Sequence, residues 1–171
     1  MVLVLMGVSG SGKTAVGSKL ADELGWRFHE GDDVHPEANV QKMARGIPLS
    51  DADRRPWLDA LHEQIAQHLR EGTHAIVACS ALKEAYRQRL SRGDGRVKFV
   101  YLRGDRDLIR DRLKDRRGHF MNPDLLDSQF RALEEPREGI TVDIDAEVDQ
   151  VVARVRAAIA EKPEGNGVSG P

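Results

Sequence analysis

The chain has 171 residues, which is the size of one domain. Lysine and arginine total 26 and aspartate and glutamate total 28, and the resulting net charge of −2 argues against a general nucleic-acid-binding surface. A single cysteine, Cys79, excludes an intramolecular disulfide and a cysteine-rich zinc site. The amino-terminal apolar run covers only residues 2–6, too short for a signal peptide or a membrane span, so we expect a cytoplasmic protein without a membrane partner.

Short apolar runs alternate with longer amphipathic segments along the chain. The runs predict strands at residues 2–6, 27–30, 74–79, 98–102 and 141–145. The amphipathic segments predict helices at residues 13–24, 54–71, 82–90, 105–116, 123–133 and 147–160. This alternation indicates one three-layer α/β domain over residues 1–160, with a parallel sheet whose active site lies at the carboxyl ends of the strands. Residues 161–171, rich in glycine and proline, predict a disordered tail.

The turn between the first strand and the first helix carries a phosphate-binding pattern. Residues 7–14 match G-x-x-x-x-G-K-[ST] in full, although an ordinary glycine-rich turn is an alternative. The predicted nucleotide-binding residues are Gly7, Val8, Ser9, Gly10, Ser11, Gly12, Lys13 and Thr14. Their backbone N–H groups can wrap the phosphates, Lys13 can reach the β- and γ-phosphates, and the Thr14 hydroxyl can bind Mg²⁺. No guanine-reading Asn-Lys-x-Asp motif is present, so the pattern favours ATP.

Carboxylates follow the second predicted strand. We expect Asp32 to face the acceptor hydroxyl, where it can orient that hydroxyl, accept its proton, or hold a magnesium-bound water. The alternative is that Asp32 or Asp33 caps the next helix. His35, which precedes a proline, is a further candidate for substrate contact, although such a position is more often structural.

Five segments resemble the gluconokinase family, which belongs to the nucleoside-kinase-like P-loop NTPases. They are M-G-V-S-G-S-G-K-T, G-D-x-x-H-P, K-M-x-x-G-x-P-L-x-D-x-D-R-x-P-W-L, C-S-A-L-K and R-x-G-H-F, in the family's order. The resemblance implies ATP-dependent phosphorylation of the 6-hydroxyl of D-gluconate, a five-stranded parallel sheet, a mobile helical lid at about residues 112–128, and often a homodimer. It also implies that Asp32 is the acceptor-side carboxylate and that Arg54 binds the sugar acid.

The physics of a sugar acid supports a role for Arg54. A carboxylate fits the planar fork of an arginine, which can bind both oxygens. Arg54 also lies at a predicted helix start, where its charge opposes the helix dipole, and this local conflict favours a functional role. The alternative is a surface ion pair with Asp51 or Asp53. Trp57 can line a sugar site, but core packing is the commoner role for such a residue.

The third predicted strand ends in Cys79 and runs into Ser80-Ala81-Leu82-Lys83. Ser80 can bind substrate or a magnesium-bound water, and Cys79 is expected to be buried. Lys83 and Arg87 are four residues apart on one helix face, where either can meet an anionic acceptor or simply face solvent. No aspartate follows this strand, so the second magnesium contact is assigned to Asp32 through water.

A basic stretch forms the predicted lid. At 100° per residue, Arg116 falls on the apolar side of its helix and Arg112 at the edge of that side. A charge facing inward needs a partner, so we expect both arginines to neutralise the triphosphate, unless the segment is simply a solvated basic helix. The loop after Arg116 is predicted to close and exclude water, and its His119 is a candidate for substrate contact.

These features predict in-line phosphoryl transfer, with Lys13, Mg²⁺ and the lid arginines neutralising charge while Asp32 aligns the acceptor hydroxyl. Three alternatives remain at this point. One is a shikimate- or nucleotide-type P-loop kinase, and another is a non-catalytic nucleotide-binding regulatory module. The third, an RNA-end kinase, would need a basic groove that the near-neutral chain does not indicate.

Overall fold

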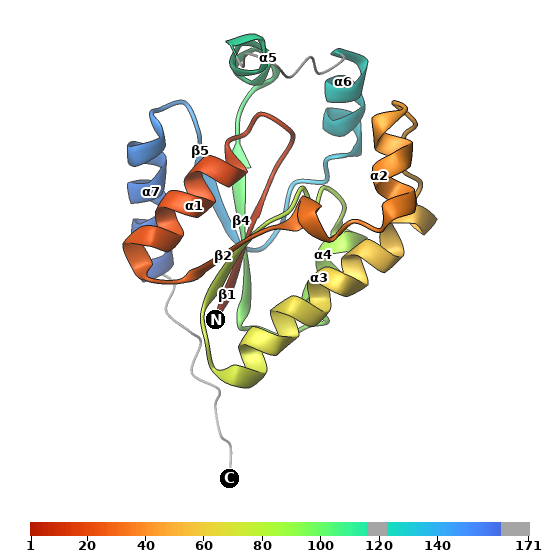
Figure 1. Cartoon of the computed structure of the whole chain (residues 1–171). Helices are drawn as coiled ribbons and strands as arrows, with labels where there is room; N and C mark the ends of the chain where they lie inside the picture. The colour runs from red at the N-terminus through yellow and green to blue at the C-terminus, as the bar shows by residue number, and fades with distance from the viewer. Residues whose placement is uncertain (116–122, 162–171) are drawn as a thin grey trace.

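The computed structural model describes residues 1–115 and 123–161, which form an α/β fold around one parallel sheet (Figure 1). Its strands are β1 (Val2–Met6), β2 (Arg27–Glu30), β3 (Ala75–Ala78), β4 (Val97–Arg103) and β5 (Ile140–Asp143). They lie in the order β2-β3-β1-β4-β5, and each neighbouring pair is parallel. The predicted five-stranded parallel sheet is therefore confirmed: β1 and β2 have the expected bounds, and the ends of β3, β4 and β5 differ from the expected ones by one or two residues.

Helices cover both faces of the sheet. They are α1 (Lys13–Leu24), α2 (Glu37–Ala44), α3 (Asp51–Glu71), α4 (Glu84–Ser91), α5 (Arg106–Asp115), α6 (Pro123–Ala132) and α7 (Val148–Glu161), with a short 3₁₀ helix η1 at Gly31–Val34. Every residue of β1 is fully buried, because the strand is central and alternates its side chains between two apolar layers. Leu3 and Leu5 pack with α1 and α7, whereas Val2 and Val4 pack with α3 and α4 (Figure 1). These are the three layers that the sequence predicts.

Two helix boundaries show how local chemistry sets the elements. Helix α1 ends as predicted, at Gly25, whose φ of 66° suits a residue without a side chain. Helix α3 begins at Asp51, three residues before the predicted start. Ser50 accepts a hydrogen bond from the backbone N–H of Asp53, whose carboxylate in turn accepts from the backbone N–H of Ser50. This reciprocal cap makes the helix begin three residues earlier in the chain than predicted.

Helix α2 is absent from the sequence-based prediction. Its eight residues bury only Asn39, while Val40 and Met43 are each more than 40% exposed. A helix whose apolar residues face solvent leaves no periodic apolar stripe in the sequence, so the segment between β2 and α3 gave no helix signal.

Parts of the expected domain organisation lie outside the described residues. These parts are the predicted tail beyond residue 161 and the middle of the predicted lid, which includes Arg116 and His119. Within the described ranges, no helix combines the length and the apolar character that crossing a membrane requires.

Candidate active site

The phosphate-binding loop joins the buried strand β1 to helix α1 at the carboxyl edge of the sheet. Its first residue, Gly7, donates its N–H to the carbonyl of Ser80 at 3.2 Å, which fixes the loop against the end of β3. The Lys13 ammonium donates to the carbonyls of Gly7 and Val8, both at 3.0 Å, and so lies over the first limb of the loop. The amino end of α1 follows directly, where backbone N–H groups lack helical partners and favour an anion.

Gly10 allows helix α5 to pack on this loop. Its φ of 83° is left-handed, and a Cβ atom there would lie 2.9 Å from Cγ of Leu113 and 3.2 Å from Cγ2 of Ile109. A larger residue would therefore strain the backbone and push α5 away. Glycine is thus required at this position both by the left-handed backbone of the loop and by the close packing of α5.

The metal side of the site includes a residue that the sequence reasoning missed. The Thr14 hydroxyl donates to Oε2 of Glu30 at 2.6 Å, which joins the start of α1 to the end of β2. Hydroxyl and carboxylate oxygens are the ligands that Mg²⁺ prefers, and this ion usually keeps several waters and substrate phosphates as its other ligands. No group of three or more His, Cys, Asp or Glu side chains that could hold a metal occurs in the described part of the chain. The one available signal for Glu30 was its position as the last residue of a predicted strand beside the loop.

Asp32 lies on the turn that follows Glu30, at the same edge of the sheet. Gly31 makes this turn possible, because a Cβ atom there would come within 2.4 Å of the Ala78 carbonyl. The Asp32 side chain is 77% exposed, and its Oδ1 lies 3.8 Å from Nε2 of His35. Asp32 therefore presents an exposed carboxylate at the same edge of the sheet as the phosphate-binding loop.

His35 is buried under this turn. Its side chain is 4% exposed and stacks on Trp57, with ring centroids 4.2 Å apart. Burial lowers the pKa of His35, against the opposing charge of Asp32, so the ring is neutral at physiological pH. Trp57 is buried and donates its Nε1–H to the Gly31 carbonyl at 2.7 Å. The geometry favours the structural alternative for His35 and places Trp57 in the core.

Side-chain bonds join α2 to the start of α3. Asn39 is buried and donates to the Asp53 carbonyl at 2.9 Å. Lys42 lies 2.7 Å from the Asp53 carboxylate, and the bonds from Lys42 and Ser50 lower the pKa of Asp53 to about 2. These contacts hold the acceptor-side segment in place without burying an apolar face.

Arg54 and Lys83 gather around one aromatic ring, that of Tyr86. The Arg54 guanidinium carbon lies 5.8 Å from the ring centroid and the Lys83 ammonium 5.5 Å from it. The surface alternative for Arg54 is not the arrangement found, since Nη1 of Arg54 donates to the Leu49 carbonyl at 2.5 Å. Asp51 instead accepts from Lys83, with both carboxylate oxygens at 3.0 Å, and from the Tyr86 hydroxyl. Sequence reasoning missed Tyr86, for which no motif gave a signal.

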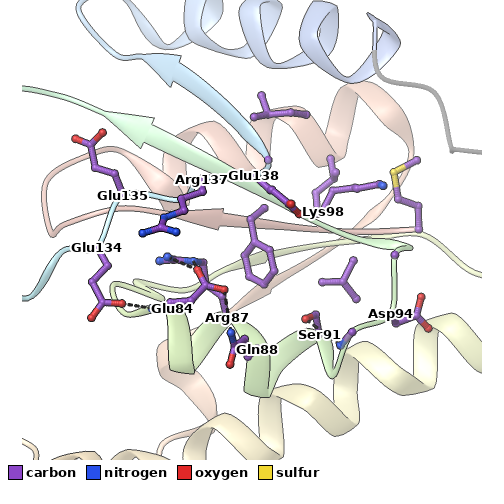
Figure 2. Close-up of a pocket in the computed structure, with 18 of the residues that line it drawn as sticks. Glu84, Arg87, Gln88, Ser91, Asp94, Lys98, Glu134, Glu135, Arg137 and Glu138 are labelled. Atoms are coloured by element: carbon purple, nitrogen blue, oxygen red, sulfur yellow. Dashed lines mark hydrogen bonds and ion pairs between the residues drawn. The ribbon is translucent and has the colours of Figure 1, made fainter.

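Arg87 does not share the position of Lys83, which corrects the prediction of a common face. Its side chain is 4% exposed and donates to the carbonyls of Ala81 and Leu82 and to the Glu84 carboxylate. It lines a pocket of about 900 Å³ beside the amino ends of β1 and β4, where Figure 2 shows it next to Glu84. Its bonds to Ala81 and Leu82 brace the turn after β3, and a substrate contact of Arg87 stays a prediction.

The turn after β3 lies against the phosphate-binding loop. Ser80 provides the carbonyl that accepts from Gly7 and stays a candidate for substrate contact. Ala81 has a φ of 41°, an uncommon value for a residue with a side chain, and such strain concentrates at functional turns. Cys79 is buried, as expected, and burial raises the pKa of its thiol to about 12, so it is an inert core residue.

The described ends of the predicted lid contact other parts of the site. Arg112 is half-buried, as its helical angle predicts, but its Nη2 donates to the carbonyls of Ile144 at 2.5 Å and Ala146 at 3.0 Å. Its charge is thus compensated by the turn after β5. Gln129 of α6 hydrogen-bonds Ser9 of the phosphate-binding loop, a contact that sequence reasoning missed.

Comparison with known proteins agrees with this geometry. A family model described as an AAA domain matches residues 2–140. The thermoresistant gluconokinase of Escherichia coli (strain K12) is 46% identical over 156 residues, covering 89% of each chain. The gluconokinase of Gluconobacter oxydans (strain 621H) is 49% identical over 134 residues, covering 78% of this chain and 75% of its own. The crystal structure of a gluconokinase from Sinorhizobium meliloti 1021 superposes with a TM-score of 0.87 at 41% identity, covering 94% of this chain and 91% of its own. The chain therefore belongs to the gluconokinase family.

Proposed function

We propose that this protein transfers the γ-phosphoryl group of ATP to the 6-hydroxyl of D-gluconate, giving 6-phosphogluconate and ADP. The observation that carries the proposal is the 2.6 Å hydrogen bond between Thr14 and Glu30, because it joins the phosphate cradle to the strand whose next turn carries Asp32. Membership of the gluconokinase family supports gluconate over shikimate or a nucleotide as the acceptor.

The donor phosphates bind to the loop backbone and to Lys13. Magnesium, when bound, neutralises charge on the β- and γ-phosphates. The Thr14 hydroxyl fits this ion, because its proton is directed to Glu30 and its lone pairs remain available to a metal. Glu30 is the better candidate for a magnesium-bound water than Asp32, to which the sequence had assigned it, since Glu30 already contacts the threonine ligand.

Asp32 aligns the acceptor and receives its proton. The acceptor oxygen forms a bond to the γ-phosphorus while the bond from that phosphorus to the β–γ bridging oxygen breaks, and the hydroxyl proton passes to Asp32. The exposed carboxylate of Asp32 suits this task, because no strong ion pair holds it elsewhere in the described structure.

The gluconate carboxylate binds beside Tyr86. Arg54 is the stronger candidate for this contact, because Asp51 already compensates the charge of Lys83. Ser80 and His35 stay predictions as further substrate contacts, as does His119. Since Arg112 bonds carbonyls after β5, the neutralisation of the transferring group by the lid is assigned to Arg116.

The proposed setting follows from the same arguments. We propose that the protein acts in the cytoplasm on a small sugar acid, without nucleic acid or a membrane as partner. The homodimer implied by the family resemblance stays a prediction.

Mass spectrometry of gluconate incubated with ATP, Mg²⁺ and the protein tests the proposal. The expected result is phosphogluconate, heavier than gluconate by one phosphoryl group. When shikimate and a nucleoside monophosphate are added as competing acceptors, phosphogluconate is expected to remain the main product. A clear preference for either competitor would overturn the choice of substrate. ATP binding without any phosphorylated product would support the non-catalytic alternative.

A further inference from the structure

Helix α6 contacts the phosphate-binding loop through a pair of hydrogen bonds that have no role in the proposed reaction as described above. The Ser9 backbone N–H donates to Oε1 of Gln129 at 2.7 Å, and Nε2 of Gln129 donates to Oγ of Ser9 at 3.0 Å. The two residues are 120 positions apart in the chain, and both are half-buried. One neutral amide thus grips both polar groups of a single loop residue.

The chemistry of the partners fixes the orientation of this amide. A backbone N–H can only donate, so the oxygen of Gln129 must face it. The Nε2 group then faces Oγ of Ser9 and can only donate to it. Because this bond uses Oγ as an acceptor, the proton of the Ser9 hydroxyl must point elsewhere and is available as a donor.

The position of Ser9 indicates where that donor is useful. Ser9 directly follows Gly7 and Val8, whose carbonyls hold the Lys13 ammonium, the group that reaches the γ-phosphate. The next residue, Gly10, is covered by Leu113 of α5. The third loop residue is therefore contacted by α6 and the fourth by α5, and both helices overlap the predicted lid at about residues 112–128.

We propose that Gln129 is a positioning residue for phosphoryl transfer: it sets Ser9 so that the Ser9 hydroxyl donates to the transferring γ-phosphoryl group while α6 is docked on the loop. The inference rests on the proposed kinase function and adds to it a residue outside the phosphate-binding pattern. Gln129 acts through Ser9 and needs no contact with either substrate. ADP, which lacks the γ-phosphate, makes no use of this arrangement.

A double-mutant cycle with Gln129→Leu and Ser9→Ala tests the proposal. Leucine has nearly the volume of glutamine but removes both hydrogen bonds. We expect each single variant to lower kcat about 10- to 100-fold, with the KM for gluconate changed by no more than about twofold. Since Gln129 acts through Ser9, the double variant is expected to be no slower than the slower single variant. Multiplying effects, or a normal kcat for Gln129→Leu, would overturn the proposal.

A charge variant adds a readout that a merely structural role would not change. In Gln129→Glu the ionised carboxylate can only accept, so it accepts a hydrogen bond from the Ser9 hydroxyl and turns that O–H away from the phosphate. Its rate deficit relative to wild type is expected to shrink as the pH falls to about 5, where the carboxyl group begins to protonate and can donate as the amide does. A deficit independent of pH would contradict the proposed role.

Nucleotide binding separates positioning from collapse of the cradle, and it needs no acceptor. The Kd for ADP is expected to be unchanged in Gln129→Leu, whereas the Kd for a non-hydrolysable ATP analogue rises. If the Kd values for ADP and for the ATP analogue rose equally, the loop would have lost its shape and the inference would be wrong. This test does not depend on gluconate being the acceptor. The matched control is Gln67→Leu, because the exposed Gln67 bonds Glu71 within its own helix and lies away from the loop.

Discussion

Residues 7–14 and residues 31–54 meet at the same edge of the sheet, but different interactions hold them in place. The phosphate side is a loop of backbone groups set between the fully buried strand β1 and helix α1. The acceptor side is held by single side chains, such as Asn39 on the Asp53 carbonyl and Trp57 on the Gly31 carbonyl. Backbone geometry repeats wherever its glycine pattern occurs, whereas side-chain bonds depend on which distant residues happen to meet. A site made of backbone groups can therefore be predicted from sequence, whereas a site held by side-chain bonds between distant residues cannot.

Lys13→Ala is expected to have the largest effect, because it removes the positively charged side chain from a loop that otherwise binds phosphate through backbone N–H groups. We expect kcat for gluconate phosphorylation to fall by about 10³-fold or more, since a fixed cation at the transferring group stabilises the transition state. The melting temperature should change little. Lys19→Ala, on the same helix but paired with Asp149, is the matched control and should keep full activity. A Lys13 variant with near-normal turnover would break the assignment of the phosphate side.

Asp32→Asn tests the acceptor side in the same assay. We expect kcat to fall by about 10²- to 10⁴-fold, because asparagine cannot accept the hydroxyl proton. ATP-analogue binding, measured by calorimetry, should be unchanged, since Asp32 lies outside the phosphate cradle. Asp33→Asn on the same exposed turn is the control and should retain activity. If Asp33→Asn proved the slower variant, the roles of the two carboxylates would have to be exchanged.

Glu30→Gln tests the bond that joins the two sides. Glutamine still accepts from the Thr14 hydroxyl but has no charge for a magnesium-bound water. We expect the Mg²⁺ concentration for half-maximal rate to rise about 10- to 100-fold, as found when residues that orient a metal ligand are lost. Glu23→Gln, at an exposed ion pair with Arg156, controls for loss of a carboxylate. An unchanged Mg²⁺ curve would remove Glu30 from the metal site.

The sequence predicted the phosphate side almost completely for a physical reason. Strand β1 and helix α1 begin and end where expected, because an apolar run must be buried and Gly25 ends the helix. The loop residues follow from their glycine spacing. Even here Glu30 and Gln129 were missed, since their partners lie 16 and 120 residues away. Spacing rules describe neighbours in a helix or strand, and they do not report contacts of this range.

The acceptor side was predicted only in part. Asp32 and Arg54 came from a carboxylate after a strand and from the family resemblance, and their roles stay predictions. Helix α2 was missed because it buries a single asparagine. Arg87 was misplaced because the four-residue spacing from Lys83 gives a shared helix face without saying which neighbours each side chain meets. Such choices are decided by tertiary packing, which one sequence does not display.

Trp57→Phe is expected to loosen the acceptor side and spare the phosphate side. Phenylalanine keeps the stack on His35 but leaves the buried Gly31 carbonyl without its donor, at a cost of about 1–3 kcal/mol in the free energy of unfolding. Urea denaturation measures this loss, and kinetics should show a raised KM for gluconate with an unchanged KM for ATP. Trp26→Phe is the matched control, because Trp26 stacks on His74 away from the site. Equal changes in both KM values would show that the two sides are not independently held.

The smallest expected effect is a shallow loss of stability in mild acid, and it too should come from the acceptor side. Burial lowers the pKa of His29 on β2 and of His35 on the following turn, below the ordinary value of 6.5. Between the lowered pKa values and 6.5 the unfolded chain binds more protons than the folded one, so stability is complete above about pH 6.5 and declines as the pH falls below it. The urea midpoint measured from pH 7.5 to 5.5 should follow this course. His35→Phe, which can keep the stack on Trp57, should flatten the decline. A decline that His35→Phe leaves unchanged would assign the proton uptake to His29, whose Nε2 lies 2.8 Å from Nε2 of His68 at the edge strand.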